Sequence, residues 1–368
     1  MSRPADSSSG GEVYARSPLP LANGTFTADG RLVVSHHPMY GTPQRVSIFS
    51  GPDTLEPFPS AAWNTPHDND DDWLDAVQGL RTDSQGRVWL LDMGSRSGIT
   101  PKFVVWDCAA NSLSQIIRLP SSVLNEVSEP NDFVIDERHG AVYIADEGAG
   151  NGGDGSRGAL IVVNTRTGQA RRRLQGRPGI VAENRPIVIE GREVTEDVEG
   201  AERRGMRVGV DGIALDHRGE WVYYGPLTGE AIWRLRTRDL LDDSLDDDEL
   251  QRRAERYAER PNTGGMWMDA ADHLYLTEIG GNSIGRIDPE TRRYERVLTR
   301  DDLFWPDDVI PGPEDALYVV VSQLPTAPPL NEGKRQPTFP FIVARFWPEP
   351  GIAGSGPDGV PADDSPRG

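Results

Sequence analysis

The chain of 368 residues contains a single cysteine, Cys108, which excludes an intrachain disulfide. No stretch approaches the ~18 consecutive apolar residues that a membrane-spanning helix needs. The N-terminal segment MSRPADSSSGGEV also lacks the apolar core of about 7–15 residues found in signal peptides. We therefore expect a cytoplasmic protein that makes no membrane contact, unless a leader has been removed.

Basic residues are outnumbered, with 38 Lys and Arg against 58 Asp and Glu, which gives a net charge of −20. Such a surface repels phosphate backbones and anionic lipids. We expect no nucleic-acid partner, and a small-molecule substrate or ligand instead. The composition leaves the oligomeric state open.

The sequence does contain a phrase that recurs six times. Each copy has a polar or glycine pair, a short apolar run, a turn with Asp or Gly, and a second apolar run. The copies are NGTFTADGRLVVS from Asn23, QGLRTDSQGRVWLLD from Gln78, NDFVIDERHGAVYIAD from Asn131, DGIALDHRGEWVYYG from Asp211, GGMWMDAADHLYLTE from Gly264 and DDVIPGPEDALYVVV from Asp307. Strand pairs repeated roughly every 40–50 residues are typical of a β-propeller.

The repeats predict an all-β fold, a six-bladed β-propeller with four-stranded antiparallel blades. In the second repeat, GLRTD and RVWLLDM are followed by the strand-like KFVVWD and QIIRL. The sixth repeat has three strands, so EVYAR at Glu12–Arg16 is expected to close the last blade and the ring. We expect the propeller to span residues 12–348, with a disordered leader at 1–11 and a disordered tail at 349–368.

One segment departs from the strand pattern. Residues 242–260, DDSLDDDELQRRAERYAER, carry acids first and arginines last, which complements a helix dipole. The sequence predicts a helical insertion here that replaces the outer strand of blade four.

The first strand of each propeller blade lines the central channel, so the polar residues that open the repeats should meet in one ring. Carboxylate and amide oxygens are suitable ligands for calcium, which takes six to eight of them. The expected metal ligands are Asn131, Asp211 and Asn23, and Asp211 is also the candidate catalytic base. The expected substrate-binding residues are Gln78, Asp132, Asp307, Asp308 and His36, the last at the end of a second strand. The alternative is that these side chains only cap strands and turns.

A second set of acids ends the second strands of the blades: Asp92, Asp146, Glu147 and Glu278. Asp146 and Glu147 are adjacent, so only one of the two can face the channel. Aromatic residues also recur on the inner and second strands, namely Trp89, Tyr143, Tyr223, Tyr224, Trp267, Tyr275 and Tyr318. Most should pack blades together, although some could form a cage for an amine.

Several phrases resemble the yellow / major royal jelly protein family, over about residues 12–347. They are VQGLRTDSQGRVWLLDMG, PKFVVWD, NDFVID, GAVYIADEG, DGIALDHRGEWVYYGPLTG and WPDDV. The resemblance is to the bacterial, dopachrome-tautomerase-related type, and it implies a six-bladed propeller with a ligand tunnel. A wider resemblance is to the senescence-marker-protein/gluconolactonase propellers, in which a Glu, an Asn and an Asp hold one divalent cation. Asn131 and Asp211 match the Asn and Asp, whereas the Glu position falls at Asn23.

These observations favour a small-molecule enzyme acting in the channel. The leading hypothesis is a metal-assisted, lactonase-like hydrolase or a related isomerase, with a divalent cation such as calcium as cofactor. The first alternative is a non-catalytic propeller that binds an aromatic or amine ligand, and the second is a protein-interaction scaffold.

Overall fold

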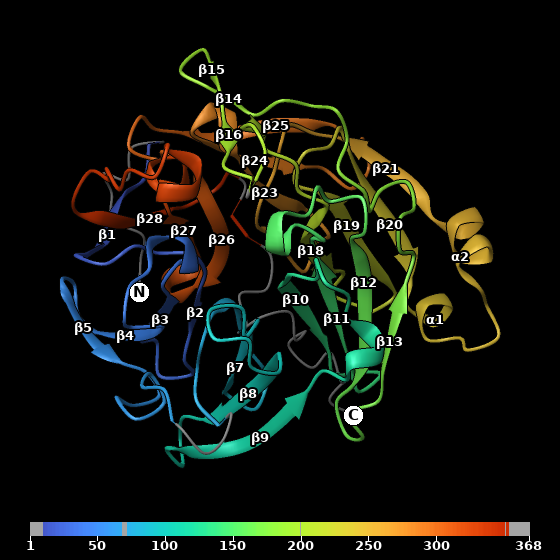
Figure 1. Ribbon diagram of the computed structural model, residues 1–368, viewed down its shortest axis with the longest axis horizontal. Helices are drawn as coiled ribbons and strands as arrows, with labels where there is room; N and C mark the ends of the chain where they lie inside the picture. The colour runs from blue at the N-terminus through green and yellow to red at the C-terminus, as the bar shows by residue number, and fades with distance from the viewer. Residues whose placement is uncertain (1–9, 68–71, 199, 350, 353–368) are drawn as a thin grey trace, which may run out of the picture.

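The computed structural model describes residues 10–67, 72–198, 200–349 and 351–352. Six four-stranded antiparallel sheets surround a common axis, as the sequence predicts (Figure 1). The first three blades are β2(Gly24–Phe26), β3(Leu32–Ser35), β4(Val46–Gly51) and β5(Thr54–Pro57); β6(Val77–Thr82), β7(Arg87–Asp92), β8(Lys102–Asp107) and β9(Ser112–Arg118); β10(Pro130–Asp136), β11(Ala141–Asp146), β12(Ala159–Asn164) and β13(Ala170–Arg173). The predicted leader and tail lie mostly outside the described residues.

The fourth and fifth blades are β18(Val210–Leu215), β19(Trp221–Pro226), β20(Ala231–Arg236) and β21(Glu255–Glu259); β22(Met266–Met268), β23(Leu274–Glu278), β24(Ser283–Ile287) and β25(Tyr294–Thr299). The sixth contains β26(Pro306–Gly312), β27(Ala316–Val321) and β28(Phe341–Phe346). The inner strands contact one another in a closed cycle, β2–β6–β10–β18–β22–β26 and back to β2. Apolar faces of adjacent blades form the core between them, as where Phe103 meets Phe133 with ring centroids 4.8 Å apart.

The N-terminal strand closes the sixth blade, which confirms the expected role of Glu12–Arg16. Strand β1(Glu12–Ser17) pairs antiparallel with β28, and Arg16 lies opposite Ile342. The sheet order is β1-β28-β27-β26. The pairing satisfies the backbone groups along the free edge of β28, which would otherwise be open to another chain.

We expect Ala15→Asp to lower the free energy of unfolding by about 3 kcal/mol or more, because it buries an unpaired carboxylate in this closure. Ala15 is 1% exposed. Arg16→Asp, one position along and on the exposed face, should change stability by less than about 1 kcal/mol. Urea unfolding of both variants measures the difference. Equal losses would contradict the inward orientation of Ala15.

The predicted helical insertion at 242–260 is shorter than expected and needs correction. Helix α1(Thr237–Leu240) precedes it, and α2(Asp247–Arg253) carries its acids in the first turn and its arginines in the last, as predicted. The chain then forms β21, the outer strand of blade four, which the helix therefore does not replace. The edge of β20 needs a partner for its backbone groups, and Tyr257 packs edge-on against Tyr223 at 4.9 Å.

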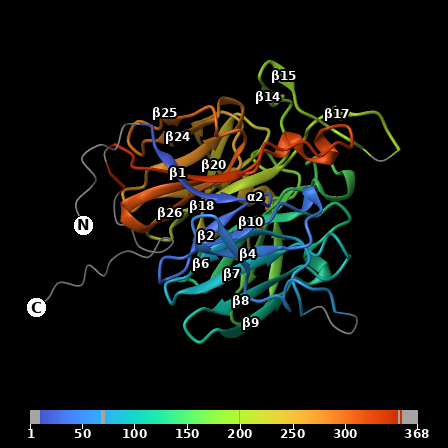
Figure 2. The ribbon, with the colours of Figure 1, turned by 90° about the vertical axis from the view of Figure 1, so that its left-hand side faces the viewer.

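Additional segments gather at one end of the channel. The long connection between blades three and four forms β14(Val188–Ile189), β15(Arg192–Glu193), β16(Thr195–Glu196) and β17(Arg204–Gly205). These project from the same side of the ring as two 3-10 helices, η6(Leu324–Thr326) and η7(Pro328–Leu330) (Figure 2). The amide of Asp197 donates to the carbonyl of Pro329 at 2.8 Å, which joins the two segments.

Further 3-10 turns connect the strands: η1(Pro38–Tyr40), η2(Ser121–Val123), η3(Gly150–Gly152), η4(Ile279–Gly281) and η5(Pro313–Asp315). In the described part of the chain, no helix has the length and apolar character required to cross a membrane.

Candidate functional site

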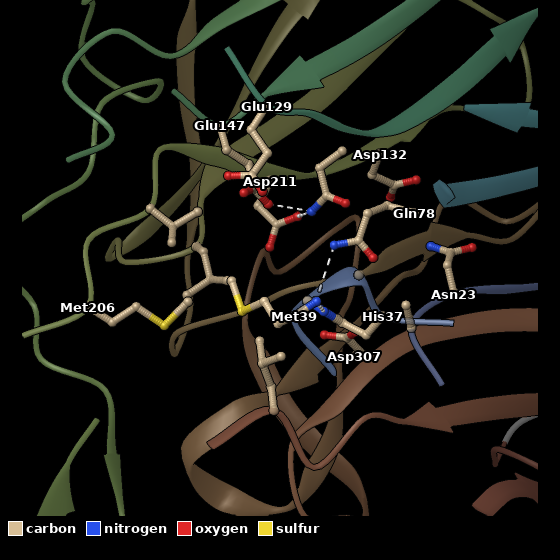
Figure 3. A pocket seen from close by; sticks show the side chains of 16 residues that line it. Asn23, His37, Met39, Gln78, Glu129, Asp132, Glu147, Met206, Asp211 and Asp307 are labelled. Atoms are coloured by element: carbon tan, nitrogen blue, oxygen red, sulfur yellow. Dashed lines mark hydrogen bonds between the residues drawn. The ribbon is translucent and has the colours of Figure 1, made fainter. Parts of the chain in front are cut away.

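A pocket opens where the inner strands begin, at the end of the channel that carries the additional segments. It collects much of the predicted ring (Figure 3). Its lining residues are Ala22, Asn23, His37, Met39, Gln78, Glu129, Asn131, Asp132, Glu147, Met206, Val208, Asp211, Leu227, Gly265, Asp307 and Leu324.

The inner strands share a local irregularity that places these polar residues in the pocket. In β10, Pro130 and Asp132 pair with consecutive residues of β11, so Asn131 is an extra residue without a cross-strand partner. The same register shift occurs at Asp211 in β18 and at Asp307 in β26. A bulge changes the direction of a side chain. Repeated bulges therefore explain how opening residues from separate blades come together at the axis.

Asn131 links two carboxylates in the pocket. Its Nδ2 donates to Asp211 Oδ1 at 2.9 Å and also to Glu147 Oε1 (Figure 3). Burial raises the pKa of Asp211 to about 7, against the lowering effect of the Asn131 hydrogen bond. Burial, and then the charge of Asp211, raises the pKa of Glu147 well above its usual range. Three polar side chains from two blades thus form one cluster, which we call the acid–amide cluster.

Further carboxylates surround this cluster. Burial, followed by the charges of Asp146 and Asp211, raises the pKa of Glu129 to about 7. Burial and Asp211 also raise the pKa of Asp307, whose Oδ1 accepts a hydrogen bond from Trp305 Nε1 at 3.0 Å. Negative charge held in a buried space favours either protons or a cation.

Three other residues of the predicted ring bind an arginine. Arg81 reaches into the channel, where its Nη2 lies 2.8 Å from Asp132 Oδ2 and its Nη1 lies 3.5 Å from Asp308 Oδ2. The same Nη1 donates to Asn23 Oδ1 at 3.2 Å, and the amide of Leu80 donates to that oxygen as well. The structure therefore places Asn23 beside a guanidinium, which disfavours its expected role as a metal ligand. Asp308 does not line the pocket.

His37, and not the expected His36, lines the pocket. His36, expected in the pocket, is fully buried outside it; Nδ1 donates to the carbonyl of Pro20 at 2.7 Å, and Nε2 contacts the Ser47 hydroxyl. His37 lines the pocket instead, with its Nε2 at 3.3 Å from Gln78 Nε2. The chain turns into η1 after these residues, so strand alternation does not decide which histidine faces the pocket.

We expect His36 to make stability depend on pH between about 6.5 and 4. Burial lowers its pKa from 6.5 to about 4. In that range the unfolded chain takes up a proton that the folded protein does not, so stability falls as the pH falls. One such proton contributes up to about 1.4 kcal/mol per pH unit. His36→Gln should reduce the slope in urea unfolding measured from pH 7 to 4 by this contribution, and the part due to His37, whose pKa burial lowers to about 3, should remain. An unchanged slope would contradict the assignment.

Of the second set of acids, only Glu147 enters the pocket. Asp92 binds Lys102 Nζ at 2.9 Å in a fully buried pair. Asp146 binds Arg172, and Glu278 binds Arg296. Of the adjacent pair Asp146 and Glu147, only Glu147 lines the pocket, as expected for neighbouring residues of a strand. The recurring aromatics are buried between strands and do not line the pocket.

The donors fit a hard divalent cation only as a mixed set. Among the described residues, no three His, Cys, Asp or Glu side chains lie close enough to hold a metal ion alone. A cation would need carboxylate oxygens of Glu147 and Asp211, the Asn131 amide oxygen after a turn of that amide, and water. Such an oxygen set matches the preference of calcium. Glu147 would supply the carboxylate that the sequence lacks at position 23.

Fold and pocket define a six-bladed propeller with an acid-lined site at one end of its channel. Residues 76–332 match the family model described as Major royal jelly protein, and the chain belongs to this family. No curated protein matches the chain.

Solved structures of similar fold include regucalcin, a calcium-binding protein from Agrobacterium tumefaciens str. C58. It has a TM-score of 0.58 and 14% identity, over 96% of this chain and 97% of that one. A luciferin-regenerating enzyme has a TM-score of 0.57 and 12% identity, over 96% and 97%. A gluconolactonase from Xanthomonas campestris has a TM-score of 0.53 and 12% identity, over 91% and 89%.

Proposed function

We propose that this protein is a lactone hydrolase that works at the acid–amide cluster with a divalent cation, calcium being the best match to the donors. One observation carries the proposal: Asn131 joins the buried carboxylates of Glu147 and Asp211 at the axis of the propeller. Regucalcin and the gluconolactonase, named for calcium binding and for lactone hydrolysis, share this architecture and support the proposal.

In this proposal Asp211 is the general base. Its carboxylate lines the pocket beside Asn131, where it can accept a proton from a bound water molecule. Water attacks the lactone carbonyl carbon while Asp211 takes its proton. The bond between that carbon and the ring oxygen then breaks, and the ring oxygen receives the proton from Asp211, which yields a hydroxy acid. A bound cation would polarise the carbonyl.

Two other groups would orient the substrate. Gln78 and His37 lie side by side on the pocket wall and offer polar atoms to the ester. Gly264 presents only backbone beside the base, since a Cβ there would lie 3.7 Å from Asp211 Oδ2.

Ligand binding without turnover is the second candidate function. The carboxylates that line the pocket would favour an amine as the ligand. Among the described residues that line the pocket there is no Phe, Tyr or Trp to stack on such a ligand, and His37 is the one side chain with a ring. This difference favours the hydrolase.

The test is metal analysis of the purified protein after equilibration with calcium, followed by a lactone and catechol-quinone panel with and without a chelator. One bound cation per chain and lactone hydrolysis that the chelator abolishes would support the proposal. Protein that hydrolyses no lactone, whether or not it binds a cation, would refute it.

A further inference from the structure

The pocket is lined by apolar side chains as well as by acids. These apolar side chains, which we call the apolar collar, are Ala22, Met39, Met206, Val208, Leu227 and Leu324. In Figure 3 the side chains of Met39 and Met206 extend toward one another. A ligand bound at the acid–amide cluster would therefore also meet aliphatic and thioether groups in the same pocket.

Most of the collar comes from segments outside the repeated strands. Met39 lies in η1, and Leu324 lies in η6. Met206 and Val208 follow β17, in the long connection between blades three and four. Four of the six collar residues therefore come from segments added to the six-bladed ring.

The collar is held in position before any ligand arrives. Met206, Val208, Leu227 and Leu324 are buried in one cluster with apolar residues of the long connection, of η7 and of blades one and six. Tyr40 Oη donates to the carbonyl of Gln323 at 2.6 Å, which ties η1 to η6. Arg203 Nη2 donates to the carbonyl of Leu330 at 3.1 Å, which ties the long connection to η7. A preformed wall binds its ligand without the cost of ordering.

This wall discriminates between kinds of lactone. A hydroxyl group buried against aliphatic side chains loses its hydrogen bonds to water without replacement, which is unfavourable. An alkyl group in the same place gains about fourfold in binding for each buried methylene. We infer that the substrate is a lactone with an alkyl or other apolar substituent, bound with its ester on the acid–amide cluster and its substituent against the apolar collar. The inference rests on the proposed hydrolase function.

The test compares three six-membered lactones on the calcium-loaded protein: δ-valerolactone, δ-decalactone and δ-gluconolactone. If three methylenes of the pentyl chain are buried, kcat/KM for δ-decalactone should exceed that for δ-valerolactone by on the order of 50-fold. δ-Gluconolactone should be the poorest of the three. Hydrolysis of δ-gluconolactone at or above the rate of δ-decalactone would overturn the inference while leaving the hydrolase proposal intact.

A pair of variants assigns the preference to the collar. Met206→Gln places a polar group of similar length in the wall and should lower the decalactone-to-valerolactone ratio of kcat/KM about fourfold or more, whereas Met206→Leu should keep it. Met39→Gln, on the less buried side of the collar, gives the same comparison if Met206→Gln does not fold. A ratio unchanged in the Gln variants would contradict the role of the collar.

If no lactone is hydrolysed, the proposed function fails. The role of the apolar collar is then tested by measuring the affinity of the protein for the same lactones. Calorimetry should then show tighter binding of δ-decalactone than of δ-valerolactone, with a negative heat-capacity change. Equal affinities, or a preference for δ-gluconolactone, would overturn the inference on its own.

Discussion

Asp211→Asn is expected to lower kcat/KM for lactone hydrolysis by on the order of 10³-fold, because the amide cannot accept the proton from water. The substitution keeps the shape of the side chain and an oxygen for the Asn131 hydrogen bond. Folding should therefore survive, which circular dichroism and thermal unfolding would check. Steady-state kinetics with δ-decalactone measures the effect.

The matched control is Glu278→Gln. Glu278 ends the second strand of blade five and, like Asp211, is largely buried, but it binds Arg296 and Tyr294 away from the pocket. Its loss should change kcat/KM less than about threefold, because the acid–amide cluster is left in place. Equal losses in the two variants would show that the Asp211 effect arises from general damage to the propeller.

Arg81→Met should lower the free energy of unfolding by about 3–5 kcal/mol, because it removes the positive partner of two buried carboxylates. Both Asp132 and Asp308 are almost completely buried. Urea unfolding measures the loss. Arg252→Met, which breaks an exposed ion pair with Glu249 on α2, should cost less than about 1 kcal/mol. A small effect at Arg81 would mean that the carboxylates beside it take up protons readily.

The sequence was sufficient to predict the ring, its six blades and its closure by β1, because the repeated phrase marks both strands of every hairpin. The sequence was less informative about where helix α2 ends and strand β21 begins. The acids and arginines of residues 242–260 outweighed the short apolar pair Tyr257–Ala258, which the structure uses in β21. A strand of five residues beside a charged helix carries too weak a pattern to be separated from it.

The site was predictable in position but only partly in composition. Asn131 and Asp211 open their repeats and do meet at the axis, joined by a hydrogen bond. Glu129 lies just before a repeat, so its presence in the pocket was not foreseen, and Met206 belongs to a segment with no repeat at all. Arg81, inside an inner strand, was not among the expected site residues, although it binds Asn23, Asp132 and Asp308 of the expected ring.

The pairing of β1 with β28 has a consequence for how the protein is made. Glu12 and Arg345 form an ion pair although 333 positions separate them. During synthesis the N-terminal strand must wait for nearly the entire chain to be translated, while blades one to five can complete their hairpins from neighbouring sequence. Contacts between such distant segments form slowly. Ring closure is therefore expected as a late step in biogenesis, and until then the unpaired β1 is a segment that a chaperone could protect.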